Sequence, residues 1–319
     1  RFGRHLLERF PRLGFKPERI FTPEHGLFGT RDEKIEHGVH EGLGVPLYSL
    51  YGEDRRPREE WFQGLDVLLF DLQDVGVRYY TYISTLKYCL ETARKTGVKV
   101  VVLDRPNPLG GEVVDGHLAE VFSFIGCDAL PTVHGMTMGE MARFLNRDIH
   151  AELRVVPMKG WRRSMVWEDT GLPFLSPSPN LAELESVKLY PVIGQIEWCR
   201  LSVGRGTNSP FRIFGAPYIN DPEALAHDLN QKFEGALKFE PRFFIPQSSV
   251  FQGELCGGVE VSSLKPLDHP AQLGLRLSAL LDERYAPQFE LEAMSGHLGR
   301  SRVREGLKIP METEHWRDI

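Results

Sequence analysis

Short runs of aliphatic residues alternate with stretches of helix-spaced apolar residues along the first half of the chain. Residues 19–22, 67–71 and 98–104 are predicted to be buried strands, because each is a short, nearly continuous apolar run. Between the last two, residues 82–95 place apolar side chains at helical spacing, and Gly97 stands where a helix C-cap belongs. This strand–helix–strand succession is typical of a parallel α/β sheet.

The pattern changes near the middle of the chain. Thr137 and Glu140 form a capping-box sequence that opens one more helix. Beyond residue 146 the segments become rich in proline and aromatic residues, as in residues 173–180. We therefore expect a domain boundary near residue 150.

The second domain, residues 151–319, is predicted to be a smaller α+β domain. Asp221 followed by Pro222 is typical of a helix start, and Pro270 opens another stretch with helical spacing of leucines. Residues 259–262 have the β-branched character of a strand.

Composition and charge narrow the function classes. The chain has 319 residues, 41% hydrophobic and 26% charged, which predicts a globular protein of two domains. The 38 Lys and Arg against 44 Asp and Glu give a net charge of −6, and no long basic tract offers a site for nucleic acid. The apolar runs are far shorter than the roughly 20 residues that cross a bilayer, so no membrane insertion is expected.

Several motifs with known chemistry are missing from the sequence. The four cysteines are widely spaced and lack metal-binding spacing, so we expect buried thiols, no metal and no cofactor. Glycine-rich nucleotide loops, the zinc-protease motif and the nucleophile elbow of serine hydrolases do not occur either.

Polar clusters follow each of the three predicted strands. They comprise residues 22–26, 71–80 and 104–111, and each mixes ionisable side chains with glycine or proline. Because ligands bind beyond the carboxyl ends of parallel strands, we expect the three clusters to converge on one edge of the sheet. The sequence therefore predicts a binding site at this edge.

The carboxylates of these clusters have structural alternatives. Asp71 and Asp104 could cap a following helix or pair with Arg78 or Arg105. Glu24, between a proline and a histidine and close to a glycine, has no helix to cap, and we favour a functional role for it.

Two further sites stand outside the strand-end clusters. His134 precedes the helix capped by Thr137, where it could donate to a substrate or serve as a buried structural histidine. Arg205 lies between two glycines, with Glu197 upstream, and could present its guanidinium to a carboxylate or simply be solvated in a turn.

Five motifs together resemble one family, the exo-acting β-N-acetylmuramidases of the NamZ type. They read TPEHG (residues 22–26), DLQDVGVRYYTY (71–82), LDRPNPLGG (103–111), HGMT (134–137) and SVGRGT (202–207). They occur in the family's order and extend over most of the chain.

This resemblance implies a bacterial peptidoglycan hydrolase. Such an enzyme releases β-1,4-linked N-acetylmuramic acid from the non-reducing end of wall fragments, so its partners are muramyl sugars, and family members act outside the cytoplasm. The implied fold is a Rossmann-like catalytic domain, residues 1–150, whose cleft the second domain closes. Family members usually begin with one more strand, so we expect the sheet of this chain to lack its first strand. A homodimer is the default expectation for oligomeric state.

The resemblance also assigns site residues. Glu24 matches the family's catalytic carboxylate, and His25 or Arg78 could orient it. The second carboxyl group of a glycosidase could be Asp71, Asp74 or Glu197, unless the 2-acetamido group of the substrate replaces it. The lactyl carboxylate of muramic acid calls for a cation, Arg78 or Arg205. Further candidates for substrate contacts are Gln73, Tyr80, Tyr82, Asp104, Arg105, Asn107, His134, Asn180 and Glu197.

Two other functions fit the same residues. A non-catalytic sugar-binding protein could use Glu24 only to accept a hydrogen bond, and an esterase or amidase could act on wall fragments. The missing nucleophile elbow disfavours the esterase.

Overall fold

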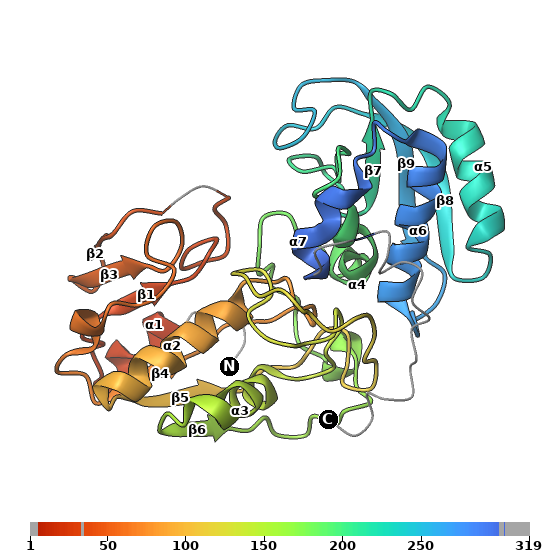
Figure 1. The fold of residues 1–319 in the computed structure, drawn as a ribbon. Coiled ribbons are helices and arrows are strands. Elements are labelled where there is room, and N and C mark those ends of the chain that lie inside the picture. Colours follow the sequence, from red (N-terminus) through yellow and green to blue (C-terminus); the bar gives the residue numbers. More distant parts are fainter. Residues whose placement is uncertain (1–5, 33–34, 300–302, 304–319) are drawn as a thin grey trace. The chain divides into compact units, whose positions relative to one another are not determined.

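Strands and helices alternate in the first half of the chain as predicted, in a computed structural model that describes residues 6–32, 35–299 and 303 (Figure 1). The chain divides into two units. Unit 1 comprises residues 1–74, 81–107 and 136–179, and unit 2 comprises residues 75–80, 108–135 and 180–319. Short helices at Leu6–Arg9 (α1) and Ser295–Leu298 (α7) lie near the two ends of the described chain.

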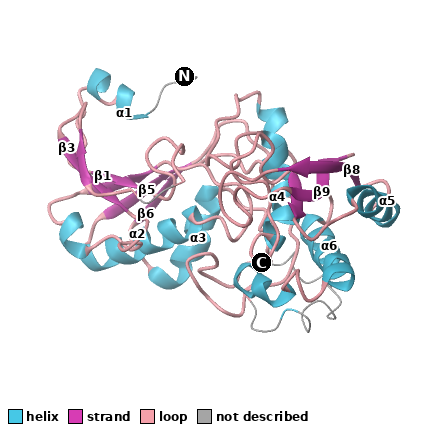
Figure 2. Ribbon diagram, turned by 90° about the horizontal axis from the view of Figure 1, so that it is seen from above, coloured by secondary structure: helices cyan, strands magenta, loops and turns pink. Residues whose placement is uncertain are grey.

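A parallel three-stranded sheet is the core of unit 1. Its strands, in the order β4-β5-β6, are Val67–Phe70 (β4), Lys99–Leu103 (β5) and Leu153–Val156 (β6). Helices Tyr82–Thr96 (α2) and Met138–Ile149 (α3) connect them and pack against each other on one face of the sheet (Figure 2). The predicted strands at residues 67–71 and 98–104 are confirmed, with bounds shorter by one residue at one or both ends.

Local signals explain where these two helices begin and end. Gly97 adopts the left-handed conformation, with φ of 76°, and its N–H donates to the carbonyl of Ala93, which ends α2. Thr137 and Glu140 form the predicted capping box at the start of α3. The apolar positions of α2 are buried against the sheet, as their spacing predicts.

A second, smaller sheet of unit 1 has the order β1-β3-β2. Strand Ile20–Thr22 (β1) pairs in parallel with Val45–Ser49 (β3), and Gly38–His40 (β2) pairs with β3 in antiparallel fashion. The sequence pattern predicts β1 but not β2 or β3, because β2 is very short and β3 contains Pro46. The pairing of β1 with β3 brings the ends of these two strands to the same edge.

Unit 2 is an α+β arrangement around an antiparallel sheet of order β7-β9-β8. Its strands are Ile213–Ala216 (β7), Leu237–Phe244 (β8) and Cys256–Ser263 (β9), and its helices are Leu184–Ile193 (α4), Pro222–Lys232 (α5) and Pro270–Tyr285 (α6). Helix α5 packs on β8 and β9, and α4 packs on α6 and β9. The predicted helix starts at residues 222 and 270 and the strand at 259–262 are confirmed.

The structure divides the chain differently from the expected boundary near residue 150. Strand β6 pairs with β5, so the parallel sheet of unit 1 continues past residue 150. Residues 75–80 and 108–135, which precede that boundary, belong to unit 2. The sequence signal near residue 150 is a change in amino-acid composition. Strand pairing, in contrast, determines which segments fold together.

Two buried charged side chains hold the early segments within unit 2. Arg78, only 1% exposed, donates to the carbonyl oxygens of His117 (2.6 Å) and Leu130, and to those of His297 and Leu298 (both 3.0 Å). These bonds tie residues 75–80 to residues 108–135 and to α7.

Asp115 makes a comparable connection to α6. It is 1% exposed and accepts hydrogen bonds from the backbone N–H of Ala271 (2.7 Å) and Gln272 (3.2 Å) at the N-terminus of α6. A buried charge is tolerated when hydrogen bonds replace its hydration, as at both of these residues.

Two further features concern the cysteines and the lengths of the helices. The four cysteines are buried and free, as predicted. Among the described residues, no helix is both long and apolar enough to cross a membrane.

The Arg78→Met variant should lose at least about 3 kcal/mol in its free energy of unfolding. The substitution leaves buried carbonyl oxygens without their donor, at about 1–3 kcal/mol for each unsatisfied group. Denaturant unfolding measures this loss. Arg276→Met is the control, because exposed Arg276 only stacks on Phe233 and should contribute less than about 1 kcal/mol. Equal stability of the two variants would contradict the role of Arg78.

Candidate active site

Glu24 lies in the loop that follows β1, and this loop has an unusual backbone. His25 has φ of 67° and Gly26 has φ of 75°, two consecutive residues in the left-handed region. The left-handed conformation is costly for a histidine and persists only where its surroundings enforce it. The ring of His25 helps to enforce it, since Nδ1 lies 2.9 Å from the carbonyl oxygen of Arg31 and 3.6 Å from an Asp32 carboxylate oxygen.

Two hydroxyl groups form hydrogen bonds with the carboxylate of Glu24. Thr81 Oγ1 donates to Glu24 Oε2 at 2.6 Å. Tyr51, two residues beyond β3, makes a side-chain hydrogen bond to Glu24. Burial, followed by the negative charge of Glu24 and this hydrogen bond, raises the pKa of Tyr51 to about 12. The phenol therefore stays protonated at neutral pH and is the donor to the carboxylate.

Tyr82 anchors the backbone of the same loop. Its hydroxyl lies 3.1 Å from the carbonyl oxygen of Glu24 and 3.1 Å from that of Pro177, so it bridges the loop to the segment after residue 173. Gly29 approaches this segment closely, since a Cβ atom at Gly29 would lie 3.0 Å from the Pro177 carbonyl oxygen. The loop is thus fixed at several points around Glu24.

The other strand-end residues of unit 1 form a separate set of interactions. Asp71, after β4, pairs with Arg105, whose Nε lies 2.7 Å from Asp71 Oδ1. Asp104 accepts from Thr137 Oγ1 (3.1 Å) and from the backbone N–H of Gly139 (2.7 Å), so it caps α3. Each aspartate thus makes one of the structural interactions that the sequence analysis named: Asp71 pairs with an arginine, and Asp104 caps a helix.

Amide side chains complete this edge of the parallel sheet. Gln73 Nε2 donates to the carbonyl oxygens of Asp74 and Pro106, both at 2.8 Å, and Asn107 donates to that of Met136 at 3.0 Å. Asp74 is 3% exposed. The roles of these residues toward a substrate stay predictions.

Several predicted site residues belong to unit 2. Tyr80, His134 and Asn180 are buried there, at 3–4% exposure. Arg78 requires a correction, because its buried guanidinium donates to four carbonyl oxygens and thereby serves to stabilise unit 2. Recognition of a substrate carboxylate is no longer assigned to it.

Arg205 pairs with Glu197 in unit 2, as an ion pair with both side chains mostly buried. Its guanidinium also lies over the ring of Phe211, 5.3 Å from the ring centre. The carbonyl oxygen of Arg205 accepts from the N–H of Gln247 at 3.2 Å.

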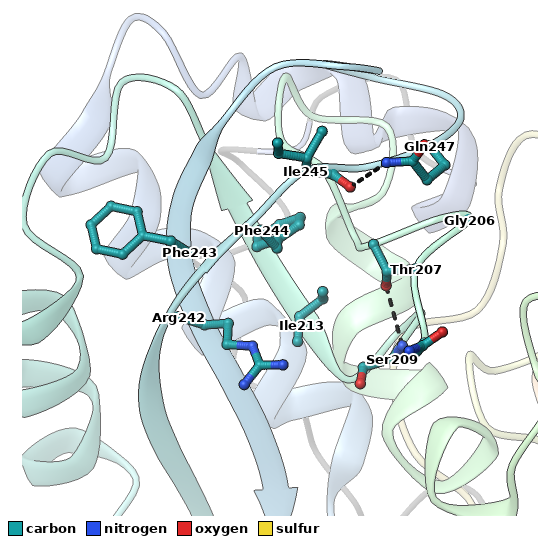
Figure 3. A pocket seen from close by; sticks show the side chains of 10 residues that line it. Gly206, Thr207, Ser209, Ile213, Arg242, Phe243, Phe244, Ile245 and Gln247 are labelled. Atoms are coloured by element: carbon teal, nitrogen blue, oxygen red, sulfur yellow. Dashed lines mark hydrogen bonds between the residues drawn. The ribbon is translucent and has the colours of Figure 1, made fainter.

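A hollow of about 340 Å³ lies beside this turn (Figure 3). It is lined by the 206–209 turn, by Ile213 of β7, and by the end of β8 with residues after it. Arg242, 55% exposed, supplies a cation at its wall.

The structure brings together some predicted residues and adds others. Glu24 and Tyr82 lie together in unit 1, and Asp71 lies with Arg105. Tyr51 and Thr81 were not predicted as site residues. The position of Tyr51 after a strand paired with β1 was the missing signal, since β3 itself was not predicted. Among the described residues, no group of three His, Cys, Asp or Glu side chains could hold a metal ion.

Comparisons with known proteins show which family the chain belongs to. The sequence model described as exo-beta-N-acetylmuramidase NamZ, N-terminal, matches residues 1–185, and its C-terminal counterpart matches residues 188–319. The peptidoglycan beta-N-acetylmuramidase NamZ of Bacillus subtilis is 42% identical over 278 residues, which are 85% of this chain and 67% of that protein.

Solved structures share the fold. A DUF1343 family protein from Bacteroides fragilis is 30% identical with a TM-score of 0.82, covering 95% of this chain and 82% of that one. A second protein of that family and organism is 28% identical with a TM-score of 0.74, covering 95% and 81%. The chain has the mixed α/β fold of these proteins, and it belongs to the NamZ exo-β-N-acetylmuramidase family.

Replacement of Glu24 should lower the pKa of Tyr51. Burial makes the largest contribution to that raised pKa and persists in the Glu24→Gln variant, whereas the negative charge of Glu24 is lost, so the pKa should fall only part of the way from about 12 toward the ordinary value of about 10. NMR titration of ring-labelled tyrosines measures the shift, and the Tyr51→Phe variant assigns the signal. Tyr285, whose pKa burial raises without Glu24, is the internal control. An unchanged Tyr51 titration would show that the two side chains do not interact.

Proposed function

We propose that this chain is a glycosidase that releases terminal β-1,4-linked N-acetylmuramic acid from peptidoglycan fragments, with Glu24 as the proton-transferring group. The observation that carries the proposal is the Glu24 carboxylate, held by the Thr81 hydroxyl at 2.6 Å in a chain that the NamZ sequence models match from end to end. General acid–base catalysis requires a carboxyl group held in a fixed position.

Glycoside hydrolysis also needs a group that stabilises the developing positive charge on the sugar. The carboxylate of Asp71 is already paired with Arg105. This pairing favours Asp74, or the 2-acetamido group of the substrate itself, for that role. In either route Glu24 gives its proton to the oxygen of the departing sugar and takes one from the attacking water.

We further propose that unit 1 is Rossmann-like. A doubly wound sheet has the strand order 3-2-1-4-5-6. Strands β3 and β1 would take positions 3 and 2, and β4, β5 and β6 would take positions 4 to 6. Parallel pairing of β1 with β3, and of β4, β5 and β6, supports this order, as do α2 and α3 on one face. Position 1 has no strand among the residues described.

Arg205 is proposed to recognise the lactyl carboxylate of muramic acid. It is partly exposed, at 22% of its side chain, and its pair with Glu197 fixes the guanidinium in one orientation. A guanidinium has several N–H groups and can bind two carboxylates at once. Arg205 can therefore bind the lactyl carboxylate while it stays paired with Glu197.

The Glu24→Gln variant should lose about 10²–10⁴-fold in kcat on a chromogenic aryl glycoside of N-acetylmuramic acid, because a neutral amide does not transfer the proton. Its circular dichroism and unfolding midpoint should stay close to those of the parent protein. Near-normal turnover would refute the role of Glu24, whereas a parent protein that binds the glycoside without hydrolysing it would favour a sugar-binding protein.

The Arg205→Ala variant should hydrolyse muramyl substrates less efficiently, with a much smaller effect on substrates that lack the lactyl group. Its kcat/KM should fall about 10- to 100-fold on the muramyl glycoside and much less on the matching N-acetylglucosamine glycoside, which has no carboxylate to bind. Arg242→Ala, which removes a nearby exposed cation, is the control and should leave the ratio of the two substrates unchanged. Equal losses on both substrates with Arg205→Ala would rule out this role.

A further inference from the structure

Thr81 stands at the N-cap position of α2 but does not cap that helix. Its backbone is helical, with φ of −66° and ψ of −13°, and its side chain makes no capping hydrogen bond. The hydroxyl donates instead to Glu24 Oε2 at 2.6 Å. An N-cap threonine normally adopts an extended conformation and accepts a bond from the second or third N–H of the helix.

Two other helices of this chain have a side-chain cap, whereas the N-cap residues of α4 and α6 make no capping hydrogen bond. Thr137 has an extended backbone and accepts from the N–H of Glu140 at 3.2 Å, which caps α3. Asp221 accepts from the N–H of Ala224 at 2.9 Å, which caps α5. A side-chain cap contributes about 1 kcal/mol to stability. Thr81 differs from these two caps, because its backbone is already helical and its hydroxyl donates to Glu24.

The residues around Thr81 restrict the movement of both partners of the Thr81–Glu24 hydrogen bond. Thr81 is 8% exposed, and Tyr82, the first residue of α2, holds the Glu24 carbonyl oxygen from the next position along the chain. Tyr51 approaches the same carboxylate from the end of β3. Adjacent residues at the start of one helix thus fix both the backbone and the side chain of Glu24.

We propose that Thr81 is a positioning residue, whose hydroxyl holds the Glu24 carboxylate in its reactive orientation. This inference rests on the proposed function of Glu24. Thr81 itself carries out no proton transfer: its proton stays on its hydroxyl and is shared with Glu24 in a hydrogen bond. The role predicts an effect on kcat, with KM little changed.

The test compares three single variants on the chromogenic muramyl glycoside. Thr81→Val removes the hydroxyl and should lower kcat about 10- to 100-fold, the range expected for a hydrogen bond to a charged group. Thr81→Ser keeps the hydroxyl and should retain kcat within about threefold. Thr92→Val is the matched control, because it removes a buried hydroxyl of the same helix that donates to the Pro57 carbonyl oxygen at 3.0 Å. It should lower stability without lowering kcat.

A double-variant cycle separates positioning from a structural effect. If Thr81 acts through the carboxylate, Thr81→Val should have almost no further effect on kcat in the Glu24→Gln background. The same fold-loss in both backgrounds, or an unchanged kcat in Thr81→Val alone, would overturn the inference. Either of these results with an inactive Glu24→Gln variant leaves the proposed function standing, whereas an active Glu24→Gln variant refutes the proposed function.

Discussion

The parallel pairing of β1 with β3 brings two distant chain segments to the same edge of a sheet, and the candidate site depends on it. Thr22 and Ser49 are partners at the carboxyl ends of these strands, and Glu24 and Tyr51 each follow two residues later. The N-terminus of α2 supplies Thr81 and Tyr82 to the same carboxylate and loop. Without this register, Glu24 would lose its hydrogen bond with Tyr51.

A second constraint acts on the long motif at residues 71–82. Its first four residues belong to unit 1, the next six to unit 2, and the last two again to unit 1. Arg78 fixes the middle part by hydrogen bonds to four carbonyl oxygens, while Thr81 and Tyr82 fix the end beside Glu24. The conspicuous polar residues of this motif therefore serve two purposes, stability in unit 2 and positioning in unit 1.

The sequence predicts best those helices and strands whose bounds depend on residues close to them along the chain. Gly97 and the Thr137–Glu140 capping box gave helix ends correctly, and the apolar runs gave β1, β4 and β5. Strand β3 was missed because a proline interrupts it, and Tyr51 was missed with it. The sequence also could not distinguish a buried arginine from a substrate-binding one, since only the fold places carbonyl oxygens around Arg78. Thr81 was not among the predicted site residues, and only the structure shows that its hydroxyl donates to Glu24.

The central claim is that Glu24 transfers its proton to the glycosidic oxygen of a terminal muramyl sugar. A crystal structure of the Glu24→Gln variant with an unhydrolysed muramyl disaccharide tests this most directly. The account predicts that the side-chain amide at position 24 lies within about 2.6–3.2 Å of the glycosidic oxygen, the reach of direct proton transfer. A glycosidic oxygen in hydrogen-bonding contact with another carboxyl group, and not with position 24, would contradict it.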